Sequence, residues 1–178
     1  MSLFGRPKGK KYHTRTIEVS TYEYDDQRFA IEGCLTDRRF QKYHMETGGW
    51  RQPGILHHMK VYWLINKKSL IIKDLHVEMP VVPGEQCNKV IGFISPVKGL
   101  RISDGFTSKV KDLLGGSKGC VHILELLIEM SFSTIQGLVA YKQQGALTSK
   151  EDIIKLAENS CWPWRSEGPY IKLLKQTE

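Results

Sequence analysis

The first half of the chain alternates hydrophobic and polar positions, which predicts strands. In residues 27–36, Phe29, Ile31 and Gly33 alternate with more polar neighbours, and a second extended segment is predicted over residues 14–21. A glycine inside a strand indicates either a bulge or the close approach of another part of the chain. We therefore expect one of these two features at Gly33.

A β-hairpin is predicted further along, where two strand patterns flank a short polar stretch. Apolar side chains share one strand face in residues 59–65, residues 66–69 supply the turn, and residues 70–79 return. His57 and His58 precede the first strand of this hairpin. Adjacent strand residues point to opposite faces, so at most one of these histidines can join any one site.

Helical spacing replaces the alternation after residue 79. A helix is predicted over residues 87–94, which places Cys87 in its first turn. A second helix is predicted over residues 106–114, with Ser103 or Asp104 as its N-cap and glycines at its end.

The longest predicted helix covers residues 118–144. Its apolar residues lie on so many sides that we expect it to be central and mostly buried. A short helix, capped by Ser149, should follow to about Glu158. Beyond it lies Cys161-Trp162-Pro163-Trp164, predicted to be a rigid lid or docking strap with Cys161 buried.

Strands first and helices afterwards predict an α+β fold. We expect an antiparallel sheet, built from the N-terminal strands and the hairpin, packed in two layers against a C-terminal set of helices. The expected organisation is a mobile basic arm over residues 1–12, one domain over residues 13–165 and a C-terminal tail over residues 166–178. No internal repeat is recognised.

Composition adds little to this picture of a globular chain. Hydrophobic residues make up 40% of the 178 residues and charged residues 25%, which suits a compact domain. The formal net charge is +7, but much of the excess lies near the termini, so solubilising ends are favoured over a nucleic-acid-binding role. The terminal cations are Arg6, Lys8, Lys10, Lys11, Lys172 and Lys175.

The expected location is the cytoplasm. No apolar run follows Lys11, so a secretory signal is not expected, and no segment is expected to approach transmembrane length. Four cysteines are too few for a disulfide scaffold, so the thiols should be reduced. We expect a protein partner, with a homo-oligomer left open, and no membrane partner.

Three cysteines stand where predicted elements begin or end. Cys34 follows Gly33, and Cys87 and Cys120 each open a helix, where backbone N–H groups favour the thiolate. With Asp37 and His122 nearby in sequence, these thiols make a ligand set suited to zinc or iron. No Cys-x-x-Cys pair occurs, and free cysteines in the core remain the alternative.

Cys120 and His122 also suggest nucleophilic chemistry. The thiol follows a glycine-rich loop that leaves backbone amides free to face an anion. Positions i and i+2 of a helix do not face each other, so the two side chains should not act as a pair if both lie inside the helix.

Short motifs around these residues resemble an uncharacterised bacterial domain family of unknown function. The motifs are His57-His58-Met59, a proline-bounded Cys87, and Gly-Cys-x-His followed by Glu-Leu over residues 119–126. Val121 and Ile123 stand where that family usually has threonine and leucine. The resemblance covers about residues 13–165 and implies a fold but no activity.

The order of Cys34, Cys87 and Cys120 is also similar to that in U-type iron–sulfur cluster scaffolds. In those proteins an aspartate stands two residues after the first cysteine and the histidine precedes the last one. Here Asp37 stands three residues after Cys34, and His122 follows Cys120. The similarity implies a metal site and leaves cluster assembly open.

Three hypotheses follow from the sequence. The first is an accessory or binding protein that holds zinc or an iron–sulfur cluster through Cys34, Cys87 and Cys120, with Asp37 or His122. The second is a non-catalytic interaction module with structural cysteines. The third is a cysteine-dependent enzyme acting on an acyl or thioester substrate, with His122 or His57 as the base.

Overall fold

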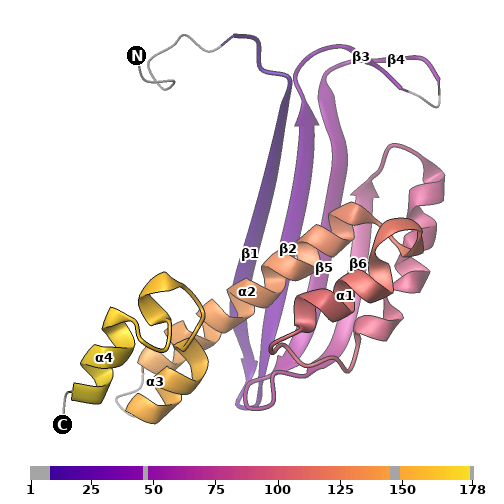
Figure 1. The fold of residues 1–178 in the computed structure, drawn as a ribbon. Helices are drawn as coiled ribbons and strands as arrows, with labels where there is room; N and C mark the ends of the chain where they lie inside the picture. Colours follow the sequence, from indigo (N-terminus) through magenta and orange to yellow (C-terminus); the bar gives the residue numbers. More distant parts are fainter. Residues whose placement is uncertain (1–8, 46–47, 145–148, 177–178) are drawn as a thin grey trace. The chain divides into compact units, whose positions relative to one another are not determined.

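The computed structural model describes residues 9–45, 48–144 and 149–176 (Figure 1). The chain divides into two compact units, residues 1–131 and 132–178. The predicted arm over residues 1–12 lies largely outside the described residues, and only residues 9–12 of it are seen leading into the first strand.

The first unit contains a four-stranded antiparallel sheet, which confirms the α+β prediction. Its strands are β1 (His13–Asp25), β2 (Arg28–Arg39), β5 (Gly54–Asn66) and β6 (Ile72–Val81), in the order β1-β2-β5-β6. The predicted hairpin is the β5–β6 pair, longer at its start than the sequence pattern indicated. Each strand of this sheet pairs antiparallel with the next strand of the sheet along the chain, so all of its connections are of the hairpin type.

A second, two-stranded sheet lies in the connection from β2 to β5. β3 (Tyr43–His44) pairs with β4 (Trp50–Arg51), so the predicted loop over residues 41–54 contains a short hairpin.

One face of the large sheet forms the core of the first unit. The central strands alternate between buried and part-exposed residues over 28–37 of β2 and 58–66 of β5, as expected for a sheet covered on one face. The buried row of β2 contains Phe29, Ile31 and Leu35, each at most 2% exposed. The opposite row of β2 and β5 is only partly buried.

Helix α1 (Phe106–Leu114) and the start of helix α2 (Val121–Gln143) cross this face (Figure 1). α1 buries Phe106, Val110 and Leu114, and Phe106 meets Trp63 of β5 edge-on at 6.2 Å between ring centroids. Gly105 precedes α1, in place of the predicted Ser103 or Asp104 cap, and Gly115 ends it as predicted. The spacing of apolar residues in the sequence did not show that the N-cap of α1 is Gly105, whose backbone is left-handed.

Gly33 is where α2 comes closest to the sheet. A Cβ built on this glycine would lie 2.5 Å from Met130 Sδ and 3.0 Å from Leu126 Cδ1. The register irregularities of β2 lie elsewhere, between Glu23 and Asp25 of its partner and beyond Asp37. Close approach, and not a bulge, therefore explains the glycine in this strand.

Short 3₁₀ helices connect the sheet to α1 and α1 to α2. They are η2 (Glu85–Phe93), η3 (Ser95–Val97) and η4 (Gly116–Lys118). η2 replaces the predicted helix over residues 87–94 and holds Cys87 in its first turn, as expected.

Helix α2 corrects the expectation that no segment approaches transmembrane length. Its 23 residues are long and apolar enough to cross a membrane, by length and composition alone. The core helix of a soluble protein passes the same test, and this one buries Ile123, Leu126, Leu127 and Met130. Only 39% of its apolar stretch is buried, so the expectation that this helix is mostly buried is wrong.

The second unit contains the rest of α2 and the C-terminal segments α3 (Lys150–Ala157), η5 (Trp162–Trp164) and α4 (Pro169–Gln176). Ser149 caps α3 as predicted, accepting a hydrogen bond from the Asp152 backbone N–H. The expected C-terminal tail contains α4, which buries Ile171 and contacts η5. Cys161 is exposed, so its predicted burial is wrong.

Candidate functional site

The core-facing rows of three strands end in polar residues at one end of the large sheet. Arg15 of β1 is in register with Asp37 of β2, which is in register with His57 of β5. Asp37 continues the buried row of β2 and is only 2% exposed, and His57 continues the buried row of β5. A carboxylate thus lies where an apolar side chain would normally complete the core.

Asp37 is held by a set of cationic and imidazole donors. Its Oδ1 accepts hydrogen bonds from Arg15 Nε at 2.8 Å and His13 Nε2 at 3.0 Å. Its Oδ2 accepts from Arg15 Nη2 at 2.8 Å and His57 Nδ1 at 3.0 Å. The two-pronged contact with Arg15 fixes the plane of the carboxylate.

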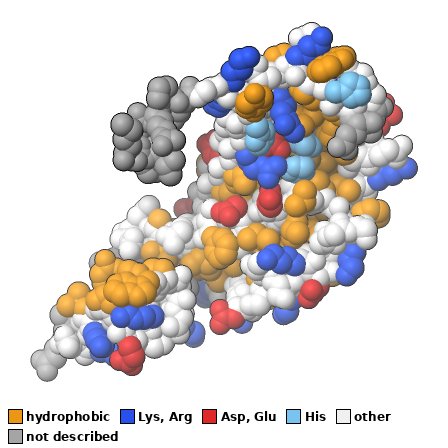
Figure 2. All heavy atoms as spheres, turned by 45° about the horizontal axis from the view of Figure 1, so that its top comes forward, with side chains coloured by type: hydrophobic (Ala, Val, Ile, Leu, Met, Phe, Trp, Pro, Cys, Tyr) orange, Lys and Arg blue, Asp and Glu red, His pale blue; other side chains and the backbone are white. Residues whose placement is uncertain are grey.

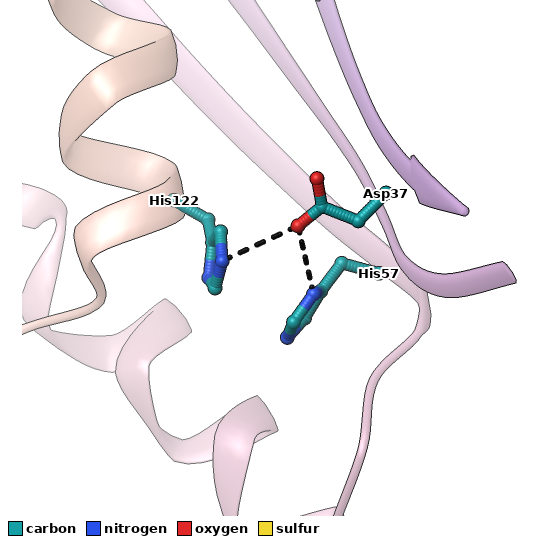
Figure 3. Close-up of side chains that lie close together, drawn as sticks. All are labelled: Asp37, His57 and His122. Carbon is teal, nitrogen blue, oxygen red and sulfur yellow. Dashed lines mark hydrogen bonds and ion pairs between the residues drawn. The ribbon is translucent and has the colours of Figure 1, made fainter. Parts of the chain in front are cut away.

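His122 approaches the same carboxylate from the first turn of α2. Its Nε2 lies 3.4 Å from Asp37 Oδ2, and its ring centroid lies 4.0 Å from that of His57 (Figure 3). The two imidazoles and the carboxylate thus converge from α2, β5 and β2. Ile123, the next residue of α2, is buried in the core and so anchors this turn over the sheet.

The charges of the group are set by burial and by these contacts. Burial alone would raise the pKa of Asp37, but the hydrogen bonds from Arg15 and His13 and the Arg15 charge outweigh it and hold that pKa far below its usual value. Burial lowers the pKa of His57 against the opposing hydrogen bond of Asp37. Burial, followed by the charges of His57 and Arg15, also lowers the pKa of His122.

This group therefore combines an ionised carboxylate with two imidazoles biased toward the neutral form. Neutral imidazole and carboxylate are the forms that bind metal ions. One ligand atom from each of Asp37, His57 and His122 lies within 4.8 Å of the others. Two imidazoles and one carboxylate are a donor set suited to zinc or iron(II).

The Arg15 side of the group borders an opening at the surface. Glu125 of α2 forms an ion pair with Arg15, on the side of the guanidinium away from Asp37. Both residues line a 290 Å³ pocket together with Ile17, Ile128 and Glu129. Figure 2 shows histidine, arginine and acidic side chains gathered on this part of the surface.

Cys120 lies on the other side of the His122 ring. Its Sγ is 3.6 Å from His122 Nδ1, the nitrogen that faces away from Asp37. The contact is possible because α2 begins at Val121, so that Cys120 lies just before the helix and is not bound by the i, i+2 rule of a helix interior. Cys120, His122 and Asp37 therefore form a chain of contacts.

Cys34 does not contact Asp37, His57 or His122. Its neighbours are His58 Nδ1 at 3.8 Å and Thr36 Oγ1 at 4.0 Å, and Thr36 and His58 share a hydrogen bond of 2.9 Å. These side chains lie on the face of the sheet opposite Asp37, because odd and even residues of β2 alternate. His57 and His58 point to opposite faces, as expected.

The structure assembles only part of the ligand set proposed from the sequence. Asp37 and His122 come together, with Cys120 beside them, whereas Cys34 lies across the sheet and Cys87 belongs to η2. Within the described ranges, the one group of three or more candidate metal ligands contains no cysteine. Sequence reasoning passed over His13, Arg15 and the role of His57.

A signal for these residues was present in the sequence. The alternation that places Leu35 and Met59 in the core, and half-buries Ile17 of β1 beside them, also places Arg15, Asp37 and His57 on the same face. Extending each apolar row by one residue pair along its strand would have found these three polar side chains on the same face of the sheet.

Comparison with protein families matches residues 13–136 to the family described as "Protein of unknown function (DUF2889)". The chain belongs to this family. The DUF2889 match begins with β1 and includes the whole polar cluster around Asp37. This cluster, called the Asp37 group, consists of His13, Arg15, Asp37, His57 and His122. The match confirms the resemblance to an uncharacterised domain family, but it does not test the Gly-Cys-x-His motif or the iron–sulfur similarity. No curated protein and no solved structure matches the chain.

Proposed function

We propose that this DUF2889 protein is a metal-binding accessory protein whose ion is held by Asp37, His57 and His122. The observation that carries the proposal is the convergence of two imidazoles and one buried carboxylate from three elements. Convergence of such donors in one place is uncommon among side chains that serve packing alone.

The two distances from the Asp37 carboxylate to the imidazoles suit a small ion, and the three ligand atoms all lie within 4.8 Å of one another. Bonds of about 2.0–2.1 Å from zinc to nitrogen or oxygen place tetrahedral ligands about 3.3 Å apart. The Asp37 Oδ2 distances to His57 Nδ1 and His122 Nε2, 3.0 and 3.4 Å, lie close to that edge length. An ion there would replace the protons that the imidazoles share with the carboxylate.

Arg15 and His13 serve as outer partners in this proposal. Both donate to Asp37 Oδ1, and Arg15 also donates to Oδ2, which orients the carboxylate so that Oδ2 faces the two imidazoles. Outer hydrogen bonds of this kind orient metal ligands in known sites. The donor set itself favours zinc or iron(II) over an iron–sulfur cluster, because clusters are held mainly by thiolates.

The test is calorimetric titration of EDTA-stripped protein with zinc and, anaerobically, with iron(II). One equivalent should bind, and His57→Ala or His122→Ala should weaken binding at least about 10-fold. His58→Ala is the matched control: the neighbouring histidine on the opposite sheet face should leave binding unchanged. Circular dichroism checks that each variant is folded. Absence of stoichiometric binding, or equal loss in all three variants, would rule the proposal out.

The chain of contacts from Cys120 through His122 to Asp37 supports a second candidate, thiol-dependent acyl transfer. In that arrangement His122 Nδ1 would accept the thiol proton, and Asp37 would stabilise the resulting imidazolium through Nε2. The thiolate would attack an acyl or thioester carbonyl and release the leaving group, which takes the proton back from His122. Water would then hydrolyse the acyl-enzyme.

Alkylation by iodoacetamide tests this second candidate. At pH 7, Cys120 should react faster than Cys161, although Cys161 is the more exposed thiol, and His122→Gln should abolish the difference. Peptide mass spectrometry separates the two cysteines. Thiol catalysis is contradicted if Cys120 is alkylated more slowly than Cys161, or if His122→Gln leaves the alkylation rate of Cys120 unchanged. Cys120→Ser should leave metal affinity unchanged, which distinguishes the two candidates.

A further inference from the structure

Beyond the Asp37 group, the same end of the large sheet carries a cluster of cationic and aromatic side chains. We call this cluster the basic tip. It contains six cations and four aromatic rings: Lys10, Lys11, Arg38, Arg39, Lys42, Arg51, Tyr12, Phe40, Tyr43 and Trp50. All ten precede residue 52, so the cluster lies within the first unit.

Three segments are joined to build the basic tip. The Phe40 backbone N–H donates to the Tyr12 carbonyl at 3.0 Å, and Gln41 Nε2 donates to the Lys11 carbonyl at 3.0 Å. These bonds fix the residues before β1 beside the end of β2. The β3–β4 pairing places Tyr43 opposite Arg51. Cations from distant parts of the sequence therefore share one surface.

The six cations of the basic tip have no carboxylate partner among the described residues, whereas Arg15, Arg28, Lys67 and Lys98 each form an ion pair. From Arg38 to His58 the sequence contains one acidic residue, Glu46, which lies outside the described residues. Unpaired cations at this density repel one another, so an anionic ligand would lower the free energy of the tip.

Aromatic rings alternate with these cations. Lys42 Nζ lies 5.1 Å from the centroid of the Trp50 ring, Lys11 Nζ lies 4.4 Å from that of Phe40, and Arg39 lies 5.8 Å from that of Tyr43. Trp50 nevertheless remains 62% exposed and Tyr12 65% exposed. In the upper part of Figure 2, hydrophobic and basic side chains lie next to one another.

We propose that the basic tip binds single-stranded nucleic acid. Unpaired lysines and arginines would contact consecutive phosphates, and bases would stack on the exposed rings of Trp50 and Tyr12. An acidic protein surface would match the charge but would leave two large exposed rings without a planar partner. An anionic membrane would require apolar side chains that insert, whereas the exposed rings here lie among cations.

Cations and aromatic rings alternate on the folded surface and not along the sequence. The sequence disfavoured a nucleic-acid-binding role because much of the excess positive charge lies near the termini. The structure places residues 10–12, 38–43 and 50–51 together. A pattern absent along the chain is thus present on the surface.

Fluorescence anisotropy with a labelled 15-nucleotide oligo-dT or oligo-U tests the proposal on the full chain, in EDTA so that no metal contributes. Trp50→Ala should weaken binding about 5- to 150-fold, the equivalent of losing one stacked base. The matched control is Trp162→Ala, which removes a comparably exposed tryptophan of the second unit and should have no effect.

Salt dependence supplies an independent readout. The double variant Lys42→Gln/Arg51→Gln should reduce the slope of log affinity against log salt by about 1.4, since each phosphate contact of a single strand contributes about 0.7. Lys172→Gln/Lys175→Gln, near the C-terminus, should leave the slope unchanged. Both pairs remove the same charge, so a net-charge effect alone would alter both equally.

Three results would overturn the proposal. The first is no binding of either oligonucleotide at 50 mM salt. The second is equal loss in the Trp50 and Trp162 variants or in the two charge variants. The third is binding to phosphatidylserine vesicles, with dependence on Trp50, without binding to the oligonucleotides. Because the assay contains EDTA, failure of metal binding at Asp37 would leave its outcome unchanged.

Discussion

At the scale of single residues, Asp37 is the centre of the polar end of the core. It accepts hydrogen bonds from Arg15, His13 and His57 while almost fully buried. Removing its charge leaves the Arg15 guanidinium without its buried partner. Asp37→Asn should therefore lower the free energy of unfolding of the metal-free protein by about 1–3 kcal/mol. Urea denaturation followed by circular dichroism measures this change.

Asp25→Asn is the control for that prediction. Asp25 also pairs with an arginine, Arg28, but both side chains of that pair are well exposed, so solvent screens the interaction and stability should change little. If the two substitutions had equal effects, burial of Asp37 would not be the cause.

The depressed pKa values of His57 and His122 predict how stability depends on pH. Below about pH 6.5 the unfolded histidines take up protons that the folded ones resist. The unfolded state then binds more protons, so stability falls as pH decreases from about 6.5 toward the folded pKa values and is regained on raising the pH. Asp37, whose folded pKa is depressed, adds a further loss as pH falls below its unfolded value of about 3.9.

The midpoint of urea unfolding between pH 5 and 8, with EDTA present, measures this dependence. A His57→Gln/His122→Gln variant should show a flatter profile over the range from 6.5 down to 5. His76→Gln is the control, because this histidine is 69% exposed and its removal should leave the profile unchanged. An unaltered slope in the double variant would contradict the prediction.

At the scale of elements, the strands were predictable because a sheet covered on one face imposes a period of two. Phe29, Ile31 and Met59 follow that period and lie in the core. The same period of two predicted that the side chains of His57 and His58 point to opposite faces of the sheet. The sequence could not show that Cys34 and Cys120 stay apart, since that depends on which face of the sheet α2 covers.

Gly33 predicts a measurable consequence of helix–sheet packing. Gly33→Ala would place a methyl group against Met130 and Leu126, so α2 or these side chains must shift. We expect a loss of about 1–3 kcal/mol in the free energy of unfolding. Gly92→Ala is the control, because a Cβ there meets nothing within 4 Å. Equal stability of the two variants would show that α2 accommodates the methyl group without cost.

At the scale of the whole molecule, the first unit contains most of the buried core and all of the residues proposed for function. Among the described buried hydrophobic residues, only Leu138 and Ile171 lie beyond residue 131. The DUF2889 match ends at residue 136, and every member of the Asp37 group and of the basic tip precedes residue 123. The residues proposed for both functions therefore belong to one unit.

A chain ending at Gln144 should consequently retain the proposed metal site. It keeps all of α2 and every strand, so the cooperative unfolding transition of the first unit should persist. Zinc affinity measured by calorimetry should agree with that of the full chain within about twofold, because no ligand or outer partner is removed. Loss of binding in a chain that still unfolds cooperatively would show that residues 145–178 contribute to the site. Loss of the transition itself would show that the first unit depends on the second for its fold.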